Sequence, residues 1–354
     1  MNNSSLLKQV LLKFTDSFKE HRKDVSAVRL TPDKHLWLGS DETSSIERLS
    51  YIDDKTFAEH KHFEVTDFID LPAPPEEEID IEGFAYSAPY LWFVGSHSWK
   101  RKKPKPDKTD EKNIARLTKL QAEPNRYIIG RIPLIDGELV KSCPHPDNPD
   151  ETISAAKLEV NQQGNVLMDA LLDDVHLGAY VKATIPGKEN GFDIEGIAVY
   201  QERIFLGLRG PVLRGWAVML EIELESSAPN LLKLKQLSTN QLYKKHFVYL
   251  NGLGIRDLCL DGEDLLILAG PTMDLDGPVR IYKLENGVNI REDVLSKPEI
   301  IKEIPYGNGD DHAEGMTLFT EYTQTPSILV LYDSPAEARL QSDSDVVADV
   351  FTLD

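Results

Sequence analysis

The sequence predicts an all-β fold built from repeated antiparallel units. The first observation behind this prediction is a recurring motif, seen most clearly as Asp80-Ile81-Glu82-Gly83 and again as Asp193-Ile194-Glu195-Gly196. The third positions of its five copies are Ser26, Glu82, Glu195, Arg256 and Glu314. These positions lie 56, 113, 61 and 58 residues apart. Self-similarity at a near-fixed period indicates a repeat architecture.

The second observation concerns the residues immediately after each motif copy. A tight turn leads into a second run rich in β-branched and aromatic residues, which is typical of a hairpin. These second runs are 35–41, 90–96, 203–209, 264–270 and 327–333. Further β-rich runs give most units a third strand and several a fourth: 46–51, 126–133, 217–224 and 279–284, then 62–68, 247–250 and 299–304. Four antiparallel strands per repeat, with no helical period in most units, predict a β-propeller.

The interval of 113 residues between Glu82 and Glu195 is twice the period and leaves the blade number open. A hidden blade near 150–185 would give six blades. Insertions would leave five, which we favour. Residues 97–125 are charged and without period, so we expect a loop insertion there. Leucines and a valine at helical spacing predict an inserted helix near 165–177.

Closure of the ring is expected to use the N-terminus. The last unit, from His312, has only three strands, and an open ring would leave edges prone to aggregation. We therefore expect residues 7–14 to supply the fourth strand and residues 1–354 to form a single domain. The alternative is that 7–14 form a short amphipathic helix on the surface.

Composition narrows the functional classes. The net charge of −20 argues against a nucleic-acid-binding protein. The N-terminus lacks the basic and apolar regions of a signal peptide, and no apolar run approaches the ~20 residues that span a bilayer. Only two cysteines occur, Cys143 and Cys259, without metal-binding spacing, which suits a reducing cytoplasm. We therefore expect a cytoplasmic protein without a membrane partner.

Several segments together resemble the bacterial domain-of-unknown-function family 3616. They are 95–98 with Lys100-Arg101, 191–196, 207–215, 252–257, 268–271 and 312–315. The resemblance runs from about Asp24 to Asp333 and implies a propeller. The family is distantly similar to phytase-like esterase and gluconolactonase-type propellers, which carry a metal in the channel mouth. The resemblance implies no activity, because the family is uncharacterised and a fold does not specify a function.

The motif glutamates are the candidate metal ligands. In a propeller, the loops that enter the innermost strands open on one face of the ring, so Glu82, Glu195 and Glu314 are expected to converge there. Converging carboxylates repel one another unless a positive charge lies among them. A divalent cation, calcium or magnesium, would suit oxygen ligands, and Arg256 is the other candidate. Alternatively, each glutamate accepts backbone N–H groups of its own blade.

The loops between second and third strands open on the same face and bring cations to it. The candidate substrate-binding residues are Arg209, Arg214, Lys100 and Arg101, and the candidate catalytic residues are His97, His312 and Arg256. Arginine binds phosphate or carboxylate through two parallel hydrogen bonds. Histidine is the usual general acid or base near neutral pH.

These residues predict a metal-dependent hydrolase of a small anionic substrate, either a phosphoester or a lactone or other ester. We favour this function because the polar residues concentrate on one face. The alternative is a non-catalytic scaffold, in which arginine and glutamate pairs are structural and the face binds a protein or peptide.

Overall fold

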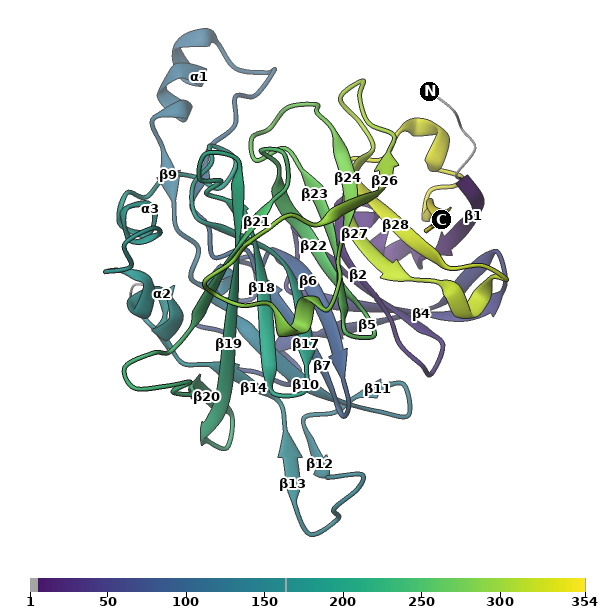
Figure 1. The fold of residues 1–354 in the computed structure, drawn as a ribbon. Helices are drawn as coiled ribbons and strands as arrows, with labels where there is room; N and C mark the ends of the chain where they lie inside the picture. Colours follow the sequence, from purple (N-terminus) through teal and green to yellow (C-terminus); the bar gives the residue numbers. More distant parts are fainter. Residues whose placement is uncertain (1–5, 163, 354) are drawn as a thin grey trace.

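The computed structural model describes residues 6–162 and 164–353, and it is all-β, with sheets that curl around a common centre (Figure 1). The first group of strands is β2 (Val25–Leu30), β3 (His35–Ser40), β4 (Ser45–Asp53) and β5 (Thr56–Glu64). The second is β6 (Ile81–Ser87), β7 (Tyr90–Gly95), β10 (Ile129–Ile135) and β14 (Ala156–Leu158). The third is β17 (Asp193–Tyr200), β18 (Arg203–Gly210), β19 (Trp216–Ala228) and β21 (Lys244–Tyr249).

The fourth group is β22 (Gly254–Asp261), β23 (Asp264–Gly270), β24 (Val279–Leu284) and β26 (Glu299–Ile304). The fifth is β27 (His312–Leu318), β28 (Ser327–Asp333), β29 (Asp345–Thr352) and β1 (Leu6–Lys13). Within every group each strand pairs antiparallel with the next. The prediction of an all-β fold is therefore confirmed.

The first strands of the groups form a closed ring. They contact one another in the order β2, β6, β17, β22 and β27, and β27 contacts β2 in turn. We call the space that they surround the channel. The end of the channel where these strands begin is its mouth, and the end where they finish is its far end.

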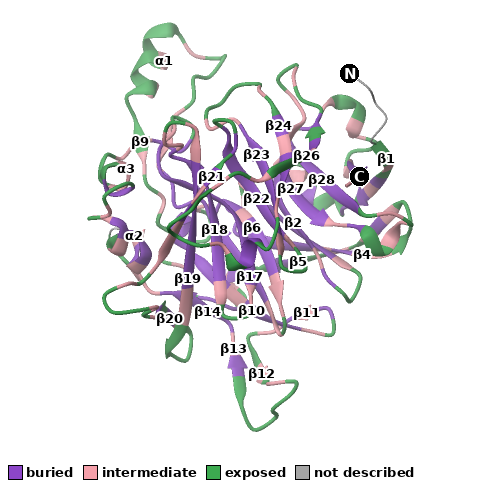
Figure 2. Ribbon diagram, in the orientation of Figure 1, coloured by how far each residue is buried: buried purple, intermediate pink, exposed green. Residues whose placement is uncertain are grey.

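The hydrophobic core lies between neighbouring groups. Trp37 and Phe84 share a cluster between the first and second groups, and Leu266 and Met316 share one between the fourth and fifth. Most of the innermost strands are buried over nearly their whole length (Figure 2). The second strands of the groups, such as β7, β23 and β28, are nearly continuous apolar runs, because they have neighbours on both faces.

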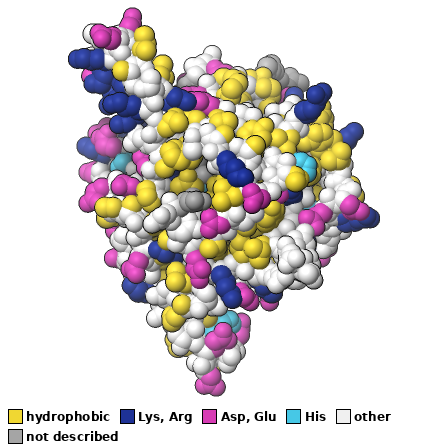
Figure 3. Space-filling model, turned by 90° about the vertical axis from the view of Figure 1, so that its left-hand side faces the viewer, with side chains coloured by type: hydrophobic (Ala, Val, Ile, Leu, Met, Phe, Trp, Pro, Cys, Tyr) yellow, Lys and Arg dark blue, Asp and Glu magenta, His cyan; other side chains and the backbone are white. Residues whose placement is uncertain are grey.

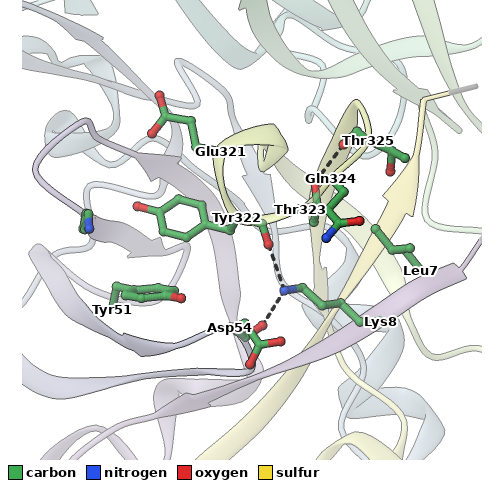
Figure 4. A pocket seen from close by; sticks show the side chains of 10 residues that line it. Leu7, Lys8, Tyr51, Asp54, Glu321, Tyr322, Thr323, Gln324 and Thr325 are labelled. Carbon is green, nitrogen blue, oxygen red and sulfur yellow. Dashed lines mark hydrogen bonds between the residues drawn. The ribbon is translucent and has the colours of Figure 1, made fainter.

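The two ends of the chain meet in the fifth group, where β1 pairs antiparallel with β29. Two residues of β1 also pair in parallel with β5 of the first group. The Lys8 ammonium donates to the backbone carbonyls of Asp54 and Tyr322, beside the packed rings of Tyr51 and Tyr322 (Figure 4). A strand near 7–14 thus lies where the sequence predicts ring closure. Of the predicted single domain, residues 1–5, 163 and 354 are outside the described residues.

Residues 97–125 form an arm that projects from the ring (Figure 1). It contains β8 (Lys100–Arg101), α1 (Asp110–Leu117) and β9 (Leu120–Gln121). Lys and Arg side chains gather on this arm (Figure 3). The sequence predicts only a loop here, so α1 corrects that expectation. The sequence does contain a local signal for this helix: Asp110 and Glu111 in its first turn complement the positive end of the helix dipole.

The helix expected near 165–177 ends early, as α2 (Val166–Leu171), and a second short helix, α3 (Gly178–Lys182), begins just after that range. The Asn165 side chain caps α2 by accepting two backbone N–H groups of its first turn. The Asp174 side chain accepts the N–H groups of the second and third residues after it, which interrupts the helical run. Val175, expected on the apolar helix face, is 88 % exposed.

Short strands complete the described chain. They are β11 (Glu138–Leu139), β12 (Ser142–Pro144), β13 (Thr152–Ser154), β15 (Val160–Asn161), β16 (Gly164–Asn165), β20 (Leu231–Leu234) and β25 (Leu295–Ser296). Parallel pairing of β14 with β20 and of β21 with β25 links neighbouring groups at their outer edges. In the described ranges, the helices are all too short or too polar to cross a membrane.

Candidate functional site

All five innermost strands break their pairing register at the third position of the motif. The breaks lie between Val25 and Ala27, Ile81 and Gly83, Ile194 and Ile197, Ile255 and Asp257, and Ala313 and Gly315. A β-bulge of this kind inserts an extra residue and re-aims a side chain. The motif residues Ser26, Glu82, Glu195, Arg256 and Glu314 are therefore set apart from the regular ladder at the mouth of the channel.

The glycine after each glutamate allows neighbouring innermost strands to approach closely. A Cβ atom added at Gly83 would lie 3.0 Å from the Cα of Gly196, and one at Gly196 would lie 2.7 Å from the Cα of Asp257. Gly196 also has a φ of +91°, which side chains other than glycine rarely adopt. In the Glu-Gly pair, the glycine therefore lets neighbouring strands pack closely, and this packing brings the charged residues of the motif copies near one another.

Two of the three predicted metal-binding glutamates are paired with buried arginines. Arg209 Nη1 lies 2.8 Å from Glu195 Oε1. Arg256 Nη1 lies 2.5 Å from Glu314 Oε1 and 3.3 Å from Glu195 Oε2. Burial acts to raise the pKa of Glu314, but the neighbouring Arg256 holds that pKa below its ordinary value. Each arginine thus neutralises a carboxylate of the ring.

Glu82 is in a different state from the other two glutamates. In the described part of the chain, no hydrogen bond or ion pair within 4 Å involves its carboxylate. Burial, and then the negative charges of Asp80 and Glu195, raise its pKa well above the ordinary value. A half-buried carboxylate without a partner costs free energy when ionised. Glu82 is therefore poised to take a proton or a bound cation.

Two aspartates at the mouth also carry oxygens without a partner. Oδ1 of Asp41 and Oδ1 of Asp193 are buried and make no hydrogen bond in the described structure. Burial, and next the charge of Glu195, raises the pKa of Asp193 to about 8. Burial, and next the charge of Asp80, raises the pKa of Asp41 well above its usual range. The mouth therefore holds more carboxylates than its arginines neutralise.

A second group of ion pairs, centred on one arginine, lies on the side of the mouth below the arm. Arg126, which the sequence did not single out, pairs with Asp80 at 2.9 Å and also contacts Glu78 and Glu123. Lys100 pairs with the same Glu78. The predicted substrate-binding residue Lys100 is therefore in a salt bridge.

The other two predicted substrate-binding cations lie towards the surface. Arg101 forms a salt bridge with Glu189 and also donates to the carbonyl of Leu117. Arg214 is exposed in the turn between β18 and β19, with a φ of +51°. Their role in binding a substrate stays a prediction.

The two predicted catalytic histidines lie in unlike surroundings. His97 is buried, with Nδ1 2.7 Å from the carbonyl oxygen of Gly95 and Nε2 2.7 Å from the amide nitrogen of Asn165. Burial lowers its pKa to about 4, so its ring is neutral and both ring nitrogens are occupied. His312 is half-buried, 3.7 Å from Asp276, and lines a small cavity at the mouth. His312 is therefore the better placed of the two to meet a ligand.

The mouth cavity also contains cations that the sequence did not flag. Lys103 of the arm and Lys188 line it together with Arg209, Arg256 and Glu314. Lys188 belongs to no motif copy, and only the adjacent Pro186-Gly187 gives a turn signal in the sequence. Across the described ranges, no three His, Cys, Asp or Glu side chains stand together as a ready metal site.

Comparison with known proteins places the chain in a family. Residues 24–349 match the model of a protein family of unknown function, DUF3616, and the chain belongs to that family. No protein of curated function matches it in sequence.

Solved structures with a similar course of the chain are propeller-type proteins. A streptogramin B lyase is 9 % identical with a TM-score of 0.39, and the match covers 98 % of each chain. The PQQ-bound aldose sugar dehydrogenase of Streptomyces coelicolor is 10 % identical with a TM-score of 0.37, covering 98 % of this chain and 97 % of that one. At these identities and scores the likenesses carry no information about activity.

Proposed function

We propose that this member of a family of unknown function is a five-bladed propeller with a cation-dependent ligand site at the channel mouth. The closed ring of five innermost strands supports the blade number, because each strand begins a group of four antiparallel strands. In this proposal the bulged motif position of every blade faces the same site.

The observation that carries the proposal is the surplus of unpaired carboxylate at the mouth. Among the residues that the structure describes, Glu82 has no partner, and the buried Oδ1 atoms of Asp41 and Asp193 have none either. Calcium and magnesium bind carboxylate oxygens and would relieve the repulsion among these groups. Glu82 is therefore the first metal ligand that we propose. Glu195 and Glu314 would join it only by exchanging an arginine for the ion.

A divalent cation at this position would support hydrolysis of a small anionic ester, because a bound ion polarises an ester oxygen or lowers the pKa of a bound water. Within that reaction the chain itself would supply His312 as the general acid or base. Arg209 and Arg256 would orient Glu195 and Glu314 rather than hold the substrate, since both arginines are already in ion pairs. A phosphoester or a lactone would suit this arrangement.

The test is the metal content and metal affinity of the wild type, Glu82→Gln and Glu225→Gln. Glu225 is a matched control, because it forms a surface salt bridge with Lys233. We expect about one calcium or magnesium ion per wild-type chain, and an affinity at least about tenfold lower in Glu82→Gln alone, as expected for the loss of a charged ligand. Equal affinities in all three proteins, or no binding to the wild type, would remove the metal site and the hydrolase with it.

The second candidate function is a scaffold for a protein or peptide. It is favoured by exposed apolar side chains on the rim of the mouth: Met273, Leu275 and Tyr306 are each between 46 % and 51 % exposed. Asp274 and Asp276 lie among them, so a basic and apolar peptide would suit this rim. A protein that binds no metal but captures such a peptide, and loses it on Leu275→Asp, would establish the scaffold.

A further inference from the structure

A strap crosses the mouth of the channel between the arm and the fourth group of strands. The strap is residues 183–191. Its Pro186 forms an isolated parallel β-bridge with Trp99 at the base of the arm. The N–H of Gly187 donates to the carbonyl of Trp99 at 3.1 Å. Its Glu189 bridges to Met273 after β23. The strap is thus held from both sides above the innermost strands.

Close packing fixes the height of the strap over the carboxylates. A Cβ atom added at Gly187 would lie 2.1 Å from Oδ2 of Asp193. Only glycine therefore allows the strap to lie directly on this aspartate. Arg101 of the arm adds a salt bridge to Glu189, so the arm and the strap are tied together.

This arrangement places the side chain of Lys188 in the cavity at the mouth. The residue is exposed to solvent, although the atoms crowded around its ammonium act to lower its pKa; the negative charges of Glu314, Asp41 and Asp333 outweigh this and raise the pKa above its ordinary value. In the residues that the structure describes, the ammonium makes no hydrogen bond and no ion pair within 4 Å. Lys188 is therefore charged, close to carboxylates, and still free to contact a ligand.

The arginines of the mouth do not have this freedom. Arg209 donates to Glu195 and to the carbonyl of Thr272, and Arg256 donates to Glu314 and to the carbonyl of Pro271. Lys103 lines the same cavity from the arm and, in the described ranges, forms no salt bridge. The cations of this cavity that form no ion pair in the described ranges are therefore the two lysines, and His312 lines the same cavity.

We propose that Lys188 and Lys103 form an anion-binding site above the carboxylates, which takes the phosphate or carboxylate group of a small ligand. This inference rests on the proposed ligand site at the mouth and assigns the anionic part of its ligand. The ligand would place its anion between the lysines and the cation held at Glu82. The role predicted from the sequence for Arg209, Arg214, Lys100 and Arg101 stays a separate prediction beside this one.

The size of the cavity limits what the site can hold. Its volume is about 80 Å³, whereas pockets for whole drug-sized ligands measure about 300–1,000 Å³. A single phosphate or carboxylate group suits this space. Lysine binds such a group as a point charge with three donors and needs no fixed fork geometry, so the flexible side chains can close on it.

The experiment measures binding of inorganic phosphate and of acetate by titration calorimetry, with and without magnesium. The proteins are the wild type, Lys188→Met, Lys188→Arg and Lys182→Met. Lys182 is the control because it ends the neighbouring helix α3 and pairs with Asp173 at the surface. We expect Lys188→Met to weaken binding of the preferred anion at least about tenfold, Lys188→Arg to restore most of it, and Lys182→Met to match the wild type.

The outcomes separate this inference from the metal site. Magnesium affinity that is unchanged or higher in Lys188→Met shows that the variant is folded, because loss of a nearby positive charge cannot weaken a cation site. Anion binding that depends on Lys188 without magnesium keeps the lysine site even if the metal proposal fails. Phosphate and acetate affinities that are the same in Lys188→Met and the wild type, or absent in both, overturn the lysine site whatever magnesium does.

Discussion

The two ends of the channel are built from the same five strands, but they differ in whether their buried polar groups have hydrogen-bond partners. At the mouth, one carboxylate oxygen of Asp41 and one of Asp193, the Oδ1 atom in each, are buried without a partner among the described residues. At the far end, the strands line a cavity of about 400 Å³, and the buried Arg29 is among its lining residues. Its Nε donates to the carbonyl of Phe84, its Nη2 to the carbonyl of Leu258, and its Nη1 to Cys259 Sγ.

This contrast separates structural charge from charge kept available for a ligand. A buried polar group normally has its hydrogen bonds satisfied, because leaving one unmade costs roughly 1–3 kcal/mol. Arg29 follows this rule and ties the first, second and fourth groups together. Glu82 and Asp193 break it at the mouth, where the resulting instability is tolerated. Exceptions of this kind concentrate at functional sites.

The largest expected effect is at the far end. Arg29→Met would remove all three hydrogen bonds and leave the carbonyls of Phe84 and Leu258 without their donor. We expect the free energy of unfolding to fall by about 3 kcal/mol, with metal affinity at the mouth unchanged in the folded protein. Denaturant unfolding of the variant measures this loss.

Arg291→Met is the control for that prediction. Arg291 is exposed and pairs with Asp293 two residues away, so its replacement should change stability by less than about 0.5 kcal/mol. Equal losses in the two variants would show that the far end is not a structural clamp, and the comparison between the ends would fail.

The next effect is a pH dependence at the mouth. The folded pKa of Asp193 is about 8, above the ordinary value of 3.8, so the folded protein holds a proton that the unfolded chain has lost. Stability from this group is present below about pH 4 and is lost as the pH rises to 8. Without divalent cations, Asp193→Asn should therefore be more stable than the wild type at pH 8, and not at pH 4.

Thermal unfolding in EDTA between pH 4 and pH 8 measures this difference. Asp173→Asn is the control, because Asp173 is exposed and pairs with Lys182 at the surface, so its curve should follow the wild type. A wild-type curve that rises over this range as fast as that of Asp193→Asn would mean that Asp193 is ionised in the folded protein. The mouth would then be as well satisfied as the far end.

The sequence predicts the strands well because their signals are local. Continuous apolar runs such as 264–270 and 327–333 are buried strands, and the Glu-Gly motif marks the start of three of the five innermost strands. The sequence does not predict that the helix near 165–177 ends at Leu171, since helical spacing cannot show that the Asp174 side chain takes the N–H groups that would continue the helix.

The site is only partly visible in the sequence because its chemistry depends on partners far along the chain. The motif identifies Glu82, Glu195 and Glu314, but only the fold shows that arginines neutralise the last two and leave the first free. His97 and His312 are both histidines in the sequence. Only the fold shows that His97 is buried and hydrogen-bonded to Asn165, whereas His312 lines the mouth cavity. Lys188 lies over the mouth through packing of Gly187 on Asp193, which no spacing in the sequence encodes.

The smallest expected effect is at Ser26, the third position of the first motif copy, which occupies the place that glutamate takes in three other groups of strands. Its hydroxyl donates to the carbonyl of Ile81 at 2.7 Å and is buried. Ser26→Ala should lower the free energy of unfolding by about 1 kcal/mol, the value of one neutral hydrogen bond. Metal affinity should stay that of the wild type, because a hydroxyl committed to a carbonyl contributes no charge to the mouth.

Denaturant unfolding and metal titration of this variant, side by side with Glu82→Gln, measure both quantities. A loss of metal affinity in Ser26→Ala as large as that in Glu82→Gln would show that the whole ring, rather than its unpaired carboxylates, binds the ion.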